Sequence, residues 1–216
     1  MGLTILYFDC FSGASGDMIL GALLDAGLPL NDLRGALGSL AVDRDAIWTE
    51  RVTRAGVSAT KFKVRGEEGT EGHRHSHGGQ PHHHHHAHED RHRTLREIST
   101  LIDGSALSKR GKDRAKGLFE TLGRVEAEIH GTSMDQVHLH EVGALDSIID
   151  IVGTVYALDT MGVDSIVSSP LNLGGGTVKS SHGLYPVPAP ATARLLQGAS
   201  VYSGPQPAEL VTPTGA

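Results

Sequence analysis

The feature that most constrains the fold is an internal stretch, residues 66–92, that shows no apolar periodicity. A segment without a regular set of apolar positions does not contribute to a hydrophobic core. We therefore expect a disordered insertion that divides a single α/β domain into residues 1–65 and 93–216. Strands and helices are expected to alternate in both parts, which predicts a mixed sheet with flanking helices.

The insertion is rich in histidine, because ten of the chain's 14 histidines lie between Gly72 and His92. Neutral imidazole is a preferred ligand of Ni, Cu and Zn. A purification tag would lie at a terminus, whereas this tract is internal and interrupted by other residue types. A flexible tract suits metal storage or relay better than catalysis, which needs ordered ligands. The predicted metal ligands of the tract are His73, His75, His77, His82, His83, His84, His85, His86, His88 and His92.

The composition excludes several classes of function. A net charge of −6 and only nine aromatic residues (four Phe, four Tyr, one Trp) argue against nucleic-acid binding. A single cysteine fits a reducing cytoplasm, and neither a signal peptide nor a membrane-spanning apolar run is found. We expect a soluble cytoplasmic protein. The sequence leaves the oligomeric state open, including a homo-oligomer.

Local patterns predict most elements. Thr4–Phe8 is expected to be a buried strand, residues 171–185 a glycine-rich loop, and Thr94 with Glu97 a capping box. The predicted helices are Met18–Ala26, Pro29–Leu40, Thr94–Ile102, Ser108–His130, Gly143–Met161 and Pro188–Leu196. The other predicted strands are Ile47–Thr53 paired with Ala59–Val64, then Ser165–Val167 and Ser200–Tyr202.

The first candidate site lies before and within the predicted helix that begins near residue 143. In an extended segment His138 and His140 project to the same side, and Glu141 follows at the corner. Asp146 and Asp150 share one helix face. We predict a metal site of His138, His140 and Asp146, with His138, His140 or Glu141 as a base. Alternatively, these carboxylates only stabilise a helix N-terminus.

The second candidate is the small-residue loop between Asp9 and Asp17. Such a loop lets backbone N–H groups approach an anion, although it matches neither a P-loop nor a dinucleotide fingerprint. The two aspartates would repel a phosphate unless a cation bridges them. A tight turn that starts a helix is the structural alternative. The predicted ligand contacts are Ser12, Gly13, Ser15, Gly16 and Asp17.

Two further features carry weaker signals. The glycine-rich segment from residue 174 to residue 183 contains Lys179, which could pair with a phosphate, and His182, which could transfer protons. A flexible connection explains its glycines equally well. Cys10 could be a soft metal ligand, but a lone cysteine at a strand end is more often a core residue.

Three motifs resemble the LarC-type nickel-insertion proteins. They are Leu6–Met18 (LYFDCFSGASGDM), Val137–Asp150 (VHLHEVGALDSIID) and Val211–Gly215 (VTPTG). The resemblance implies insertion of Ni(II) into pyridinium-3,5-bisthiocarboxylic acid mononucleotide, a CTP-dependent reaction that yields a nickel-pincer nucleotide. It also implies a C-terminal domain, associated with CTP and a divalent metal, beyond the residues present here. The nickel-pincer-dependent lactate racemase is an expected partner.

The reaction implied by the resemblance needs a base, because a Ni–C bond replaces a ring C–H bond. We expect the tract to collect Ni(II) and to pass it to His138, His140 and a carboxylate. The substrate phosphate would lie against Ser12–Asp17 or Lys179. A non-catalytic nickel store and a metal-dependent hydrolase are the alternative functions.

Overall fold

The computed structural model describes residues 2–54, 56–65, 93–139, 143–180 and 183–216. The predicted insertion, residues 66–92, lies outside these ranges. The helices are α1 (Gly16–Asp25), α2 (Leu30–Gly38), α3 (Leu95–Gly104), α4 (Lys109–His130), α5 (Leu145–Thr160) and α6 (Pro190–Leu195), with a 3-10 turn at Arg44–Ala46. The strands are β1 (Ile5–Phe8), β2 (Ile47–Arg54), β3 (Val57–Val64), β4 (Arg93–Thr94), β5 (His138–Leu139), β6 (Ser165–Ser168), β7 (Leu171–Asn172), β8 (Thr177–Ser180), β9 (Gly183–Pro186) and β10 (Val201–Tyr202).

The α/β class is confirmed, but the described strands form five two-stranded sheets and not one mixed sheet. The pairs β1–β6 and β7–β10 are parallel, whereas β2–β3, β4–β5 and β8–β9 are antiparallel. Most of these strands are only two to four residues long. A strand of two to four residues offers few backbone hydrogen bonds to a third neighbour, although the eight-residue strands β2 and β3 also form only a two-stranded sheet.

The strand β1 is less buried than its sequence predicts. It pairs with β6 from Ile5 opposite Ser165 to Phe8 opposite Ser168. Ile5 and Tyr7 remain 58% and 59% exposed, because only the alternate residues of β1 pack against the core. The prediction of a buried strand is therefore wrong, because an apolar run alone does not distinguish a strand that is buried on both faces from one that is buried on a single face.

Three helix boundaries follow capping signals in the sequence. Thr94 Oγ1 accepts a hydrogen bond from Glu97 N–H, and the Glu97 carboxylate accepts one from Thr94 N–H, which forms the predicted capping box of α3. Ser108 Oγ accepts from Gly111 N–H at 2.9 Å and caps α4. Gly27, just after α1, has a φ of +114°, which glycine adopts without strain.

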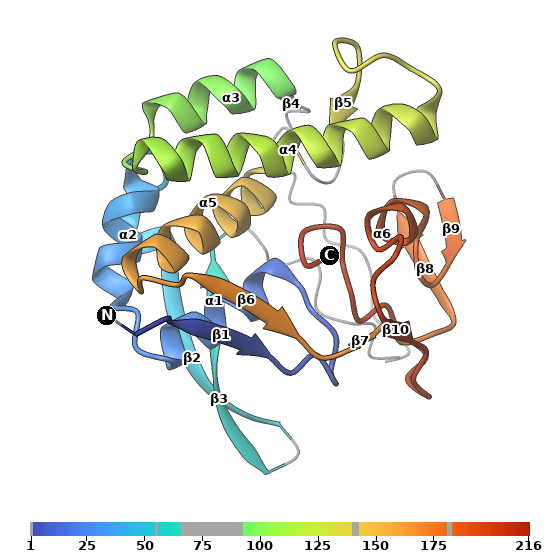
Figure 1. Cartoon of the computed structure of the whole chain (residues 1–216), viewed down its shortest axis with the longest axis horizontal. Coiled ribbons are helices and arrows are strands. Elements are labelled where there is room, and N and C mark those ends of the chain that lie inside the picture. The colour runs from blue at the N-terminus through green and yellow to red at the C-terminus, as the bar shows by residue number, and fades with distance from the viewer. Residues whose placement is uncertain (1, 55, 66–92, 140–142, 181–182) are drawn as a thin grey trace, which may run out of the picture.

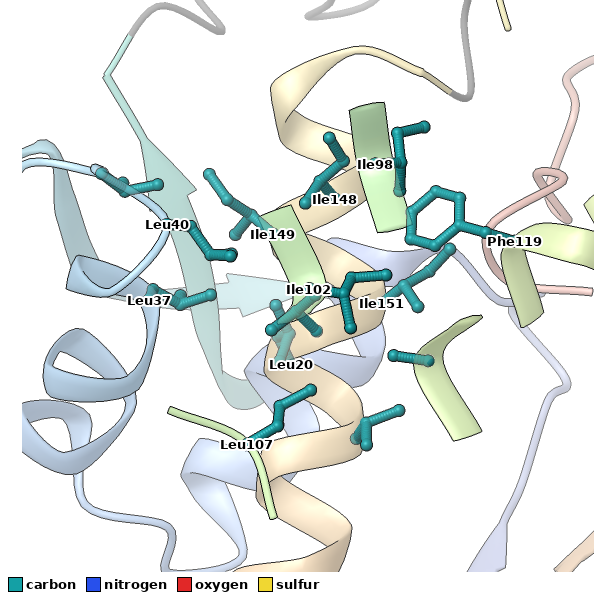
Figure 2. Packing of buried hydrophobic residues seen from close by; sticks show 14 of the residues in the cluster. Leu20, Leu37, Leu40, Ile98, Ile102, Leu107, Phe119, Ile148, Ile149 and Ile151 are labelled. Atoms are coloured by element: carbon teal, nitrogen blue, oxygen red, sulfur yellow. The ribbon is translucent and has the colours of Figure 1, made fainter. Parts of the chain in front are cut away.

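The core is built around α5, which packs against α1, α2 and α4 (Figure 1). Ile148, Ile149 and Val152 of α5 are at most 1% exposed. Burying each such side chain stabilises the fold by about 1.5–3 kcal/mol. Figure 2 shows Leu20 of α1, Ile102 of α3 and Phe119 of α4 around this helix. One buried cluster thus joins residues from both sides of the histidine tract.

The predicted loop at residues 171–185 instead contains β7, β8 and β9. Val178 lies opposite Tyr185, and Lys179 lies opposite Leu184, in the β8–β9 hairpin. The glycine content suggested a loop, but Gly174, Gly175 and Gly176 precede β8, and Gly183 is the first residue of β9. No helix in the described ranges is long and apolar enough to cross a membrane.

Candidate functional site

The loop between β1 and α1 is held in a tight turn. Gly13 N–H donates a hydrogen bond to Cys10 O at 3.0 Å, and Cys10 N–H donates to Ser169 Oγ at 2.8 Å. Gly13 has a φ of +87°, and a Cβ atom there would overlap the carbonyl of Leu210. Only glycine satisfies both conditions without strain.

Asn172, at the end of β7, braces this loop from a buried position. Its side chain is 4% exposed; Nδ2 donates to Phe11 O at 2.8 Å, and Oδ1 accepts from Gly174 N–H at 3.1 Å. A buried amide bonded at both ends fixes the backbone that it touches. Sequence reasoning missed Asn172, because a single Asn before a glycine run has no distinctive spacing.

The C-terminal motif lies on the other side of the loop. Ala14 N–H donates to Leu210 O at 2.9 Å, and Thr212 N–H donates to Ala14 O at 3.1 Å. Ala14 and Val211 therefore form an isolated parallel bridge. A Cβ atom on Gly215 would overlap Ala14 O, so this glycine permits a close approach of the two backbones. The first and third motifs are in direct contact.

Asp150 of α5 connects the second motif to the same loop. Its carboxylate lies so close to Gly16, the first residue of α1, that a Cβ atom on Gly16 would overlap it. The N-cap residue Ser15 does not cap α1 with its side chain, and its hydroxyl instead donates to the Asp17 carboxylate. Asp150 thus supplies negative charge where the helix N-terminus favours it.

Of the predicted ligand contacts, Ser12, Gly13 and Ser15 lie on this braced loop, and Gly16 and Asp17 are the first two residues of α1. Ser12 is exposed, whereas Gly13 and Gly16 are buried against the chain itself. Their contact with a ligand stays a prediction. Lys179 is exposed on β8, and its side chain makes no hydrogen bond or ion pair within the described residues.

Cys10 is a core residue in this structure, with 6% of its surface exposed. Burial raises the pKa of the Cys10 thiol, and the neighbouring Asp9 carboxylate raises it further. The thiolate is the form that binds metals, so both effects work against Cys10 as a ligand.

The segment that carries His138 pairs with the residues that follow the histidine tract. In the antiparallel β4–β5 pair, Thr94 lies opposite His138 and Arg93 lies opposite Leu139. Thr94 is only two residues after His92, the last histidine of the tract. The pairing therefore places Thr94, which follows the tract closely in the sequence, opposite the first residue of the predicted metal set.

Arg93 also holds the other side of this segment. Arg93 Nη1 donates to Gly143 O at 3.2 Å. A Cβ atom on Gly143 would overlap Leu139 O, so these two residues are in close contact. Leu139 and Gly143, the described residues on either side of positions 140–142, are therefore in close contact, and Arg93 links Gly143 to β4.

The predicted metal set is only partly described. His140, Glu141 and the histidines of the tract lie outside the described residues, as does the side chain of His138. Asp146 is exposed on α5, and its Oδ1 accepts from Ser147 N–H at 2.8 Å. Among the residues described, no three His, Cys, Asp or Glu side chains are placed to hold a metal. The metal set stays a prediction.

A cavity of about 550 Å³ lies between α3, α4 and the segment that precedes β5. Sequence reasoning gave no sign of it. Its wall carries two cations, Arg96 and Lys116, and two carboxylates, Glu120 and Asp135, so its charge does not select an anion. Thr94 also lines it, which places the cavity beside the β4–β5 pair.

The sequence of this chain is similar to those of known nickel insertion proteins. A family model described as "Nickel insertion protein" matches residues 6–216. A pyridinium-3,5-bisthiocarboxylic acid mononucleotide nickel insertion protein of Geobacillus kaustophilus is 47% identical over 214 residues, covering 99% of this chain and 50% of the relative. The protein of the same name in Desulfitobacterium hafniense (strain DSM 10664 / DCB-2) is 43% identical over 210 residues, covering 97% and 47%.

A putative nickel insertion protein of Geotalea uraniireducens is 44% identical over 216 residues, covering 99% of this chain and 50% of the relative. The chain thus spans about half the length of the curated relatives it matches. Comparison with solved structures gives no match. Because the family model covers nearly the whole sequence, the chain belongs to the nickel insertion protein family.

Proposed function

We propose that this chain binds Ni(II) and takes part in its insertion into pyridinium-3,5-bisthiocarboxylic acid mononucleotide. The names of the relatives support the assignment of this substrate, and the histidine tract supports the assignment of nickel as the metal. The product would be the nickel-pincer nucleotide, used by a racemase of the lactate type. We assign the CTP dependence, and the divalent metal that accompanies CTP, to the additional length of the relatives.

The observation that carries this proposal is the β4–β5 pairing. It joins the end of a ten-histidine tract to the strand of His138, through Thr94 and Arg93. Flexible imidazoles collect nickel without a fixed geometry, whereas insertion needs ordered ligands. We assign the tract to collection, and His138, His140 and Asp146 to the ordered site that receives the ion.

The chemistry requires one bond to break for each bond formed at the ring carbon. The two thiocarboxylate sulfurs displace protein ligands from Ni(II), the Ni–C bond forms, and the ring C–H bond gives its proton to a base. Glu141, His138 or His140 is the proposed base. Substrate contacts are assigned to Ser12, Gly13, Ser15, Gly16 and Asp17, and to Lys179, whose ammonium group would pair with the phosphate.

A nickel store is the second candidate function. It is favoured by the concentration of ten histidines in one tract that shares no residue with the three motifs. In a store the tract is the whole metal site. In an insertion protein it feeds a second site, so removal of the tract separates the two functions.

Nickel titration by calorimetry tests the proposal. We would compare the intact chain, a chain that lacks residues 72–92, and that deletion combined with His138→Ala. We expect a tight site that survives the deletion and disappears with His138→Ala. Loss of all nickel binding with the tract would instead identify a store. Nickel-dependent consumption of the sulfur-bearing substrate tests the insertion step. It is measured in a full-length relative, with and without the substitution that corresponds to His138→Ala.

A further inference from the structure

Phe11 is the one phenylalanine of this chain whose ring is exposed. The chain has four phenylalanines; Phe62 and Phe119 are at most 2% exposed, Phe8 is half-buried, and Phe11 is 67% exposed. The ring lies on the loop between β1 and α1, inside the first family motif. Leaving a large apolar ring in water gives up about 1.5–3 kcal/mol of burial free energy. Single exposed apolar side chains are common, so what distinguishes Phe11 is its place on this loop within the first family motif.

The backbone that carries Phe11 is fixed from both sides. Its carbonyl accepts from the buried Asn172 amide at 2.8 Å, and the preceding Cys10 is bonded to Ser169. The turn closes at Gly13. A ring on a braced backbone loses little further backbone entropy when it binds a ligand, which is the property of a preorganised contact.

The charges around the loop favour a cation over an anion. Asp9 is exposed two residues before Phe11, and Asp17 follows at the start of α1. The anion position at the N-terminus of α1 is taken by the Asp150 carboxylate, which lies against Gly16. A phosphate would meet three carboxylates near this loop, whereas a positively charged ring would be attracted by them.

We propose that Phe11 stacks against the face of the substrate's pyridinium ring, so that this loop receives the ring end and not the phosphate end. The proposal rests on the proposed function for its ligand. A pyridinium is a flat aromatic cation, and cations bind over aromatic faces. The two thiocarboxylates are anionic and lie at the ring edge, where Ni(II) bound to their sulfurs offsets their charge, so the face remains free and the pyridinium charge is not cancelled. The exposed Ser12 is then adjacent to the ring-binding surface, and Lys179 remains available to the phosphate.

The test uses nicotinamide mononucleotide, a pyridinium mononucleotide without sulfur, and its reduced dihydropyridine form. Binding of each to the intact chain is measured by calorimetry. We expect the oxidised form to bind more tightly than the reduced form, because only the former has a cationic ring. Phe11→Leu keeps an apolar side chain without a π face, and should weaken binding of the oxidised form about 3- to 30-fold. Phe11→Trp should retain or improve binding.

Two variants complete the design. Leu184→Ala, on a hairpin residue that is 69% exposed, is the matched control for loss of an exposed apolar side chain and should leave binding unchanged. Asp9→Asn should weaken binding of the oxidised form more than that of the reduced form. Thermal unfolding of each variant confirms that the loop change has not unfolded the chain.

Equal binding of both redox forms, or unchanged binding in Phe11→Leu, would overturn the stacking proposal. Absence of oxidised-form binding in the intact chain would overturn it as well. None of these results bears on nickel binding by the tract or on the transfer of nickel to His138, which the nickel titration tests separately. Conversely, a chain without an ordered nickel site could still show Phe11-dependent pyridinium binding, so the two failures are distinguishable.

Discussion

The carboxylate of Asp150 and the Cα atom of Gly16 are packed so closely that no side chain fits between them. This contact joins the second family motif to the first, across more than a hundred residues of sequence. On its other side the loop contacts the third motif, through Ala14 and Val211. The loop between β1 and α1 is therefore the place where all three motifs meet.

Gly16→Ala should destabilise the chain, because the added methyl group overlaps the Asp150 carboxylate. Overpacking of this kind costs about 1–3 kcal/mol, and each kcal/mol lowers the Tm of a chain this size by about 2–4 °C. Combining Gly16→Ala with Asp150→Ala should restore part of the loss, so the two effects should not add.

The matched control for that pair is Gly117→Ala in α4, where a Cβ atom meets nothing within 4 Å. It should stabilise the chain by about 1 kcal/mol through helix propensity alone. Thermal unfolding of the four variants and the parent provides the comparison. Strict additivity of Gly16→Ala and Asp150→Ala would contradict the contact.

Arg93→Gln should weaken the ordered nickel site without affecting the tract. The substitution removes the guanidinium that donates to Gly143 O and leaves the β4–β5 backbone pairing possible. A hydrogen bond from a charged donor contributes about 1.5–3 kcal/mol, so nickel affinity should fall about 10- to 100-fold if this bond orders the site. Calorimetry on the chain lacking residues 72–92 measures it, with Arg96→Gln as the control. Equal affinities would show that Arg93 does not order the site.

The sequence predicted the helices well because their ends carry local signals. Thr94, Ser108 and Gly27 each mark a boundary through a hydrogen bond or a backbone conformation that involves only nearby residues. The β1–β6 pairing had no such signal, since Ile5 and Ser165 meet only in the folded chain. The β2–β3 hairpin was predicted because its strands are neighbours in the sequence, whereas the partners of distant strands and the exposure of a strand depend on tertiary packing, which local patterns do not contain.

The candidate site was also predictable only in part, because local spacing places side chains on a helix face but does not show which of them are buried. The spacing of Asp146 and Asp150 placed both on one helix face, and the structure separates them by burial. Asp146 is exposed, whereas Asp150 is half-buried against Gly16. The hydrogen bonds of Asn172 and the exposure of Phe11 became visible only with the loop in place, because neither residue belongs to a pattern of chemically reactive residues.

Nickel held by the tract should be released as the pH falls. Imidazole binds metal only in its neutral form, and its unperturbed pKa is about 6.5. Bound nickel should decrease between about pH 7 and pH 5.5 and return when the pH is raised. Equilibrium dialysis followed by metal analysis, on the intact chain and on the chain lacking residues 72–92, isolates the contribution of the tract. Retention of all tract nickel at pH 5 would contradict binding through imidazoles.

Cys10 should react slowly with alkylating agents in the folded chain. Burial raises the pKa of its thiol, and the Asp9 carboxylate adds to that increase, so the thiolate fraction at pH 8 lies below that of a free cysteine. Reaction with iodoacetamide should therefore be slower than for free cysteine, and unfolding in urea should restore the free rate. Asp9→Asn removes the second cause and should lower the thiol pKa, which increases the rate. Because Asp9 is exposed, this acceleration should diminish at high salt. A folded chain that reacts as fast as free cysteine would contradict the buried position of Cys10, and would restore it as a candidate nickel ligand.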